Sequence, residues 1–304
     1  MNRYKDNPIV ARWFAGDLTD YHGTYTLRVL SAHQQVINLA VDGWGHLLAL
    51  ASPALYKGPA AICLEEEDFS KCSKQLVPPA TGRFQPGRLE LMGREGRIAI
   101  DWTGRPTYTF GPPPLPAVDP LKLSRMLGLV YSYLSLSEKV PASGILLGLE
   151  GGESYFRKRL IGDFPLLVQS LANGQGEQFA LSCRRLCGLG RGATPTGDDL
   201  IHGALVAGRY YFHSRRLSWT APAYPPGLHR DTTRLGGHML EMARRGLTME
   251  PVRNLLTALF TARLHRWHLN CMLEIGSSTG FDLTVAICYT LRHLLHIGHT
   301  LQLR

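Results

Sequence analysis

The sequence has no uncharged apolar run that approaches the roughly 18 residues needed to cross a bilayer. Its first residues, MNRYKDNPIVARWFAGD, have no apolar core of the kind that an export signal carries. Cysteine is sparse, with six residues scattered over 304 positions and no spacing typical of a disulfide scaffold. We therefore expect a cytoplasmic protein with reduced thiols and no contact with a membrane.

The charge balance is basic, with a formal net charge of +9. Strongly basic chains often bind nucleic acid, but here no Lys/Arg-rich tract interleaves with aromatic residues and no reading motif is present. The 44% hydrophobic and 19% charged content is that of a globular protein. The arginines are therefore assigned to a small anionic substrate and to solvated helix faces, and no nucleic-acid partner is predicted.

The chain changes character at the proline-rich segment 111–116, GPPPLP, which continues neither a helix nor a central strand. Before it, polar and apolar residues alternate as in half-buried strands. After it, apolar residues recur with the three- and four-residue spacing of a helix face. We predict an α+β protein with a β-rich N-terminal domain (1–110), a linker (111–118) and a mostly helical domain (119–304).

Individual elements follow from the same patterns. The predicted strands are 25–30, 36–41, 46–51, 60–64, 88–91 and 97–102, the last two joined as a hairpin around Gly93-Arg94-Glu95-Gly96. The predicted helices are 119–137, 200–212, 232–245, 252–260 and 283–295.

Two short segments of the helical part, 196–200 (TGDDL) and 279–283 (TGFDL), are identical at four of five positions. Each follows small, flexible residues and opens a segment with helical apolar spacing. The N–H groups exposed at a helix start bind anions. The two copies are therefore predicted to face one another across a single site.

Helix capping is the alternative explanation of the pair. Thr196 with Asp199, and Thr279 with Asp282, fit the capping box, in which a threonine N-cap precedes an acidic residue at the third helical position. Capping alone does not explain the alternating glycines of segment 188–192, GLGRG, because glycine is costly to order and is used where a ligand approaches the backbone.

The binding hypothesis assigns a role to each residue type. Asp198, Asp199 and Asp282 are the predicted catalytic residues, and as acceptors they bind a substrate N–H or hold Mg²⁺ against an anion. Backbone N–H groups, hydroxyls and one guanidinium bind the anion itself. The predicted anion-binding residues are Gly188, Gly190, Arg191, Gly192, Thr194, Thr196, Gly197, Ser277, Ser278, Thr279 and Gly280. No dedicated metal site and no certain cofactor are predicted.

Residues 188–208, GLGRGATPTGDDLIHGALVAG, resemble the signature of the AllH-like family, approximately Gly-x-Gly-x-Gly-Leu-Thr-Pro-Ser-Gly-Asp-Asp-Phe/Leu. Residues 277–282 are similar to the family's second element, Ser-Ser-Gly-x-Asp, although Thr279-Gly280-Phe281 looks like an insertion. Segments 231–235 (DTTRL) and 58–62 (GPAAI) are similar to other parts of the family. Ala193 and Thr196 replace the Leu and Ser of the first signature and leave its Gly-Asp-Asp core intact.

The resemblance implies a subunit of the oxamate carbamoyltransferase of anaerobic allantoin breakdown. That enzyme converts oxalurate and phosphate to oxamate and carbamoyl phosphate, and two partner subunits share the task. Oxalurate, phosphate or carbamoyl phosphate is then the anionic substrate, and the chain docks with partners or self-associates. The alternative function is a non-catalytic anion- or phosphate-binding regulatory protein that kept the site and lost the chemistry.

Other polar groups carry weaker signals. The histidine sets 293/296/299 and 265/268 have a three-residue spacing that drifts around a helix, so they are interpreted as polar-face residues and not as metal ligands. Cys183 and Cys187 lie one helical turn apart without a second pair, which is typical of packing. His202 follows the aspartate pair and is interpreted as structural, with general acid–base catalysis as the alternative.

Overall fold

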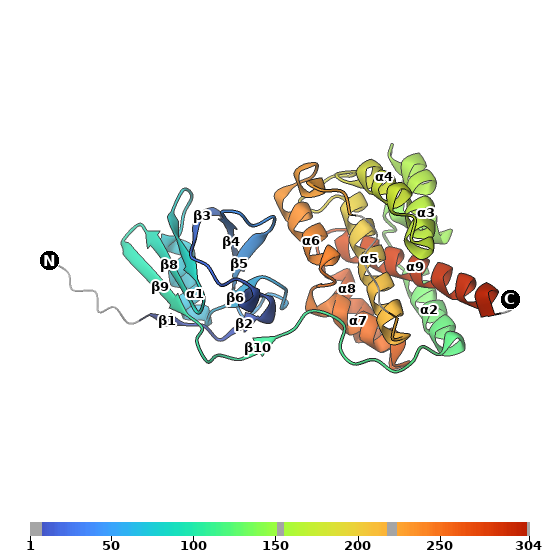
Figure 1. Ribbon diagram of the computed structural model, residues 1–304, viewed down its shortest axis with the longest axis horizontal. Coiled ribbons are helices and arrows are strands. Elements are labelled where there is room, and N and C mark those ends of the chain that lie inside the picture. The colour runs from blue at the N-terminus through green and yellow to red at the C-terminus, as the bar shows by residue number, and fades with distance from the viewer. Residues whose placement is uncertain (1–7, 151–154, 218–223, 303–304) are drawn as a thin grey trace. The chain divides into compact units, whose positions relative to one another are not determined.

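The computed structural model describes residues 8–150, 155–217 and 224–302, with side chains up to residue 297. The chain divides into two compact units, residues 1–110 and 111–304. The first unit, blue to green in Figure 1, is rich in strands, and the second, green to red, is helical. The predicted α+β class, with strands in the first part and helices in the second, is confirmed.

The first unit is built on one curled sheet with the strand order β1-β9-β8-β7-β3-β4-β5-β6-β2-β10. The strands are β1 (Ile9–Val10), β2 (Trp13–Ala15), β3 (Tyr25–Ala32), β4 (Val36–Val41), β5 (Leu47–Ala51), β6 (Ala61–Cys63), β7 (Thr81–Gln85), β8 (Arg88–Gly93), β9 (Gly96–Asp101) and β10 (Thr107–Tyr108). The Ala11 N–H donates to the Asp101 carbonyl and the next N–H, of Arg12, to the Cys63 carbonyl, both at 2.8 Å. One short stretch of chain therefore joins the two sides of the sheet and curls it toward a barrel.

All six predicted strands are present, within two residues of the expected bounds at most ends, because their alternation places one face in the core. Leu27 and Val29 of β3, and Leu89 and Leu91 of β8, are buried and their neighbours in sequence are not. The helix α1 (Glu66–Gln75) was not predicted. It begins with three acidic residues and buries only Phe69 and Cys72, so its apolar signal is too short to show a period.

The second unit is a helical bundle arranged around α5 and α9 (Figure 1). Its helices are α2 (Pro120–Ser135), α3 (Arg157–Asn173), α4 (Gly176–Leu186), α5 (Thr196–Ser214), α6 (Arg234–Arg244), α7 (Glu250–Phe260), α8 (Arg266–Leu273) and α9 (Thr279–Gln302). It also contains the 3₁₀ turns η2 (Ala142–Leu147) and η3 (Leu228–Arg230), while η1 (Gly16–Asp20) belongs to the first unit. Residues 196–208 of α5 are buried on every side, as are residues 279–288 of α9. A helix that is buried all round is the core of its domain.

The two central helices approach so closely that a side chain is excluded between them. A Cβ added to Gly203 of α5 would lie 2.6 Å from the Cβ of Ala286 and 2.9 Å from the carbonyl oxygen of Leu283, both on α9. This close crossing brings the first turns of α5 and α9 together. The duplicated motifs occupy these turns.

The five predicted helices of this unit are present, but α5 and α9 begin one turn earlier than expected, at Thr196 and Thr279. The motifs are thus part of the helices and do not precede them. The helices α3, α4 and α8 were not predicted. No helix in the described ranges is long and apolar enough to cross a membrane.

Candidate functional site

The two Thr-Gly-x-Asp motifs are in direct contact, which confirms the prediction that they face one another. The hydroxyl oxygens of Thr194 and Thr279 lie 2.6 Å apart, and the Thr196 hydroxyl donates to Oδ2 of Asp282 at 3.1 Å. Each contact joins the first motif or its loop to the second motif. The site is therefore built from two segments that are far apart in sequence.

The surroundings of the two motifs repeat as well. Each motif follows a shorter helix, α4 or α8, and opens a long one. A Cβ added to Gly197 would lie 1.9 Å from the carbonyl oxygen of Leu186, at the end of α4, and one added to Gly280 would lie 1.6 Å from that of Met272, near the end of α8. The motif glycines are thus required by packing in both copies, and the second unit contains an internal helix–loop–helix repeat.

The capping-box explanation is wrong for the first copy. The N-cap of α5 is Pro195, which offers no side-chain hydrogen bond, and Thr196 is the first helical residue. Its hydroxyl is used by Asp282 of the other copy, whereas a cap would have used its own helix. Thr279 is likewise the first residue of α9, with its hydroxyl against Thr194. The threonines hold the two copies together.

Asp198 is committed to the loops around it. Its Oδ1 accepts the Gly188 N–H at 2.8 Å, and its Oδ2 accepts the Thr232 hydroxyl. Burial raises its pKa, and these two hydrogen bonds oppose the rise. With both oxygens used inside the protein, Asp198 fastens the glycine-rich loop to the segment that precedes α6.

Asp282 is also fully engaged. It accepts hydrogen bonds from Ser143 at Oδ1 and from Thr196 at Oδ2. It is completely buried, and burial raises its pKa to about 6, against the lowering effect of the Ser143 and Thr196 hydroxyls. Ser143 lies on η2, so this carboxyl joins η2, α5 and α9 at one point.

Asp199 differs from the other two aspartates. It is 1% exposed, and no donor in the described part of the chain completes a hydrogen bond to either of its carboxylate oxygens. Burial, and next the nearby carboxyls of Asp282 and Asp198, raise its pKa well above the ordinary value, and only the Thr279 hydroxyl lowers it. An unpaired buried carboxyl is costly, and perturbed groups of this kind concentrate at functional sites.

The expected anion seat is smaller than the sequence indicated. The Gly188 N–H is used by Asp198, the Gly197 N–H donates to the Leu189 carbonyl at 2.7 Å, and the Gly280 N–H to the Ile275 carbonyl at 3.0 Å. The loop carbonyls turn back over the helix starts and occupy these donors. The N–H groups of Gly188, Gly197 and Gly280 were expected to bind the ligand, and they instead make hydrogen bonds inside the protein.

The donors that remain lie in the loop itself. The N–H groups of Gly190, Gly192 and Thr194 donate to no residue that the structure describes. Gly190 and Gly192 have φ values of +126° and +99°, a backbone conformation that favours glycine. Arg191 between them is exposed, as is Ser277, and Ser278 is half-buried.

Three residues outside the motifs complete the site and were not predicted as part of it. They are Ser143, bonded to Asp282; Thr232, bonded to Asp198; and Thr233, whose hydroxyl donates to the Ala193 carbonyl and accepts the Gly236 N–H at 2.9 Å. The similarity of segment 231–235 to the family is a usable sequence signal for the two threonines. Ser143 had no such signal.

His202 is a structural residue, as the sequence indicated. It is 1% exposed, and its Nε2 lies 2.9 Å from the hydroxyl of the buried Thr248. Burial lowers its pKa from 6.5 to about 4. The neutral imidazole is therefore part of the core of α5.

We expect His202 to make the fold acid-sensitive. The folded state keeps the imidazole neutral down to about pH 4, while the unfolded chain binds a proton near pH 6.5. The contribution of His202 to the free energy of unfolding is complete above pH 6.5. It is lost as the pH falls toward 4, by about 3 kcal/mol in total. Urea unfolding of the wild type and of His202→Gln, from pH 7.5 to 4, measures it. Equal pH dependence in the two proteins would contradict this assignment; the shared trend of Asp282 cancels in the comparison.

Other groups offer no metal centre. Among the described residues, no group of three or more His, Cys, Asp or Glu side chains is arranged to hold a metal ion. The His265 N–H donates to Nδ1 of His268 at 3.1 Å, where the pair caps the start of α8. His299 lies outside the described side chains. All six cysteines, including Cys183 and Cys187, are free thiols.

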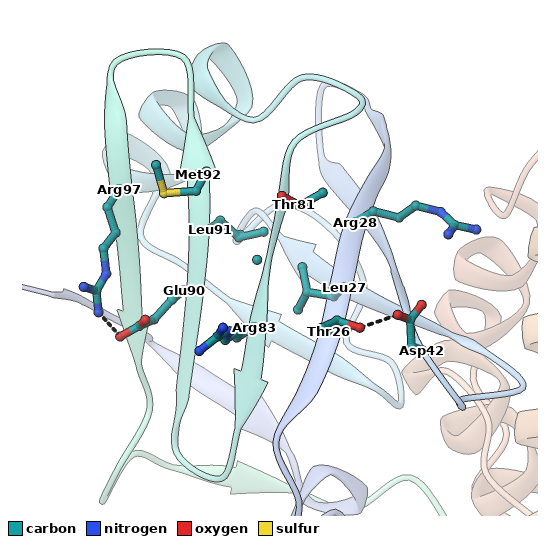
Figure 2. A pocket seen from close by; sticks show the side chains of 11 residues that line it. Thr26, Leu27, Arg28, Asp42, Thr81, Arg83, Glu90, Leu91, Met92 and Arg97 are labelled. Atoms are coloured by element: carbon teal, nitrogen blue, oxygen red, sulfur yellow. Dashed lines mark hydrogen bonds and ion pairs between the residues drawn. The ribbon is translucent and has the colours of Figure 1, made fainter.

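A hollow of about 570 Å³ lies on the sheet of the first unit and was not predicted. Figure 2 shows it over β3, β7, β8 and β9, where outward positions of the strands carry arginines. Arg97 is paired with Glu90, whereas Arg28 and Arg83 have no acidic partner in the described ranges. Their alternation with Leu27 and Phe84 was the sequence signal for this basic face.

Comparison with known proteins gives the family. The family model described as oxamate carbamoyltransferase subunit AllH matches residues 186–291, which include both motifs and segment 231–235. The model of the AllH family N-terminal domain matches residues 7–107, the strand-rich unit. No curated protein and no solved structure matches the chain. The two family matches together cover more than half of the 304 residues, and the chain belongs to the AllH family.

Proposed function

We propose that this chain is a subunit of a carbamoyltransferase of the oxamate type, acting on oxalurate or a closely related ureido acid and phosphate in allantoin breakdown. The observation that carries the proposal is Asp199, a buried carboxyl that no described residue pairs, at the point where two motifs meet beside loop N–H groups that donate to no described residue. The family description supports the same transfer.

The reaction moves one carbamoyl group and one proton. A phosphate oxygen bonds to the carbamoyl carbon, the bond from that carbon to the amide nitrogen breaks, and the nitrogen leaves as oxamate. Hydrogen phosphate loses a proton overall and the leaving nitrogen gains one. No covalent enzyme intermediate is needed, so orientation and proton delivery are the tasks of the protein.

The site offers a distinct place for each end of such a substrate. The glycine-rich loop at Gly190 and Gly192, with Arg191, binds the anionic end through N–H groups and a charge-assisted contact. Carboxyl oxygens are acceptors for N–H groups, so the end of the substrate that carries N–H groups lies toward Asp199. This division keeps the roles expected from the sequence, in which the aspartates accept a substrate N–H and the loop binds the anion.

Turnover in this proposal depends on partner subunits, in keeping with the word subunit in the family description. The six free thiols are consistent with a reducing, cytoplasmic location. The roles proposed for the aspartates and the loop do not require Mg²⁺.

A non-catalytic anion-binding protein is the second candidate function, and the arginine-lined hollow of the first unit favours it. Arg28 and Arg83 lie there on neighbouring strands without acidic partners in the described ranges (Figure 2). Two free guanidinium groups bind phosphate or a carboxylate without any need for the aspartates.

Two arginine variants separate the candidates. We expect Arg191→Gln to weaken the binding of oxamate and oxalurate by about ten- to a hundredfold, because a charge-assisted hydrogen bond is lost. Arg83→Gln, which also changes an exposed arginine, is the matched control and should leave binding unchanged. Calorimetric titration measures both. Loss of binding in the Arg83 variant alone would favour the anion-binding alternative, and no binding by the wild type would refute the proposed function.

A further inference from the structure

A row of hydroxyl groups leads from the exposed loop toward Asp199. Thr194, at the end of the glycine-rich loop, is half-buried, and its hydroxyl oxygen lies 2.6 Å from that of Thr279. Thr279 is 8% exposed and is the residue whose hydroxyl favours the charged form of Asp199. The order from the surface inward is therefore Thr194, Thr279, Asp199.

Three other hydroxyls of the site are already used. Ser143 and Thr196 donate to Asp282, and Thr232 donates to Asp198. Thr279 is the hydroxyl that acts on Asp199, where it lowers the pKa of that carboxyl. Of the charged groups that face Asp199, one is Asp198 on its own helix and the other is Asp282 on α9.

The two copies of the motif differ in their access to the surface. In one, the Thr196 hydroxyl ends at Asp282, whose second oxygen is closed off by the fully buried Ser143. In the other, Thr279 continues outward to the half-buried Thr194. Of these two carboxyls, Asp199 is the one with a connection to the loop where a ligand is expected.

We propose that the hydroxyls of Thr194 and Thr279 form a relay that carries a proton from Asp199 to the substrate nitrogen bound at the loop. The relay rests on the proposed function for the identity of that nitrogen, which is the amide nitrogen of the leaving oxamate. In this relay the Thr279 hydroxyl pairs with Asp199, whose two carboxylate oxygens have no completed hydrogen bond among the described residues. Thr194 touches the substrate, and Asp199 acts through the two threonines.

The transfer balances in three linked steps. Asp199 gives its proton to the Thr279 oxygen, Thr279 gives its own proton to the Thr194 oxygen, and Thr194 gives its own to the leaving nitrogen. That nitrogen takes the electron pair of the broken bond to the carbamoyl carbon. Both threonines end as neutral hydroxyls, and the carboxylate of Asp199 is reprotonated by the proton that hydrogen phosphate releases.

The relay also explains why a buried acid is placed here. Desolvation, together with the two neighbouring carboxyls, raises the pKa of Asp199 well above its ordinary value, which favours the protonated form, and a protonated carboxyl serves as a donor. When Asp199 is ionised, both hydroxyls turn inward and Thr194 presents a lone pair to the ligand. The protonation of Asp199 therefore sets whether Thr194 donates or accepts.

Thr→Val and Thr→Ser variants test the relay, because valine keeps the shape and serine keeps the hydroxyl. We expect Thr194→Val and Thr279→Val each to lower turnover of the assembled enzyme by about 10²–10⁴-fold, the range for lost acid catalysis. The serine variants should stay within about tenfold of the wild type. In mixtures of H₂O and D₂O the wild-type rate should fall along a curve, since more than one proton moves in the step.

Titration of the carboxyls by ¹³C NMR tests the relay without any substrate. Thr279→Val should raise the pKa of Asp199 and leave that of Asp282 unchanged. Thr196→Val should raise the pKa of Asp282 and leave that of Asp199 unchanged. The relay would be overturned if the pKa of Asp199 were the same in Thr279→Val as in the wild type. It would also be overturned if the wild-type rate fell linearly with the D₂O fraction and Thr194→Val were fully active. A chain that binds neither oxalurate nor oxamate would refute the proposed function, while the NMR result would still decide whether Thr279 serves Asp199.

Discussion

Asp199→Asn should lower the phosphate-dependent cleavage of oxalurate by about 10²–10⁴-fold, since general acid–base groups contribute on that scale. The folded state should be as stable as the wild type or more stable above neutral pH, because the substitution removes a buried charge that no described residue pairs. The gain should shrink as the pH falls, since Asp199 itself then becomes neutral. Activity of the co-purified assembly and the melting temperature at pH 6 and pH 8 are the two measurements.

Asp198→Asn is the matched comparison, one residue away and equally buried. Its carboxyl accepts a backbone N–H and a hydroxyl, so an amide group there leaves one of those donors opposed by another donor. We expect a loss of about 1–3 kcal/mol in the free energy of unfolding. If Asp198→Asn kept full stability and Asp199→Asn kept full activity, the structural role of Asp198 and the catalytic role of Asp199 would both be wrong.

The third carboxyl, Asp282, shows why the site lowers the stability of the fold near neutral pH. Raising the pKa of Asp282 from 3.8 to about 6 means that the folded state binds its proton more tightly than the unfolded chain does. The associated stability is full below pH 3.8 and is lost as the pH rises through 6, by about 3 kcal/mol in all. A cluster of this kind is typical of function and not of stability.

The largest structural effect is expected from the motif glycines. Gly197→Ala and Gly280→Ala each place a methyl group within 2 Å of a backbone carbonyl oxygen, 1.9 Å at Leu186 and 1.6 Å at Met272. A backbone atom cannot move aside as a flexible side chain does, so each substitution should destabilise the second unit by at least about 3 kcal/mol, the upper part of the overpacking range. Urea unfolding followed by circular dichroism measures the loss.

Gly162→Ala is the control for these two substitutions. Gly162 lies inside α3, is exposed, and has no atom within 4 Å of the added Cβ. Alanine there should stabilise the helix by about 0.5–1 kcal/mol. If Gly197→Ala were as well tolerated as Gly162→Ala, the close packing of α5 on the end of α4 would be wrong, and the glycine would have to be explained by ligand approach alone.

The part of the fold that could be predicted is the part with a local signal. Strands such as β4 and β8 alternate buried and half-buried residues, and α7 repeats its leucines along one face, so neighbours in sequence reveal the element. The helices α1, α4 and α8 have short or mixed apolar faces, and their stability comes from packing. Their existence depended on contacts that no local window contains.

For the candidate site, the sequence by itself determined the family and indicated the duplicated Thr-Gly-x-Asp pair with its glycine-rich loop. Only the tertiary structure decided what each residue does. Thr196 fitted a helix cap in sequence but bonds Asp282 across the bundle, and adjacent Asp198 and Asp199 diverge into one satisfied and one unpaired carboxyl. The reason is physical: a hydrogen-bond partner and a degree of burial are properties of a position in space, and here the close crossing of α5 and α9 sets them.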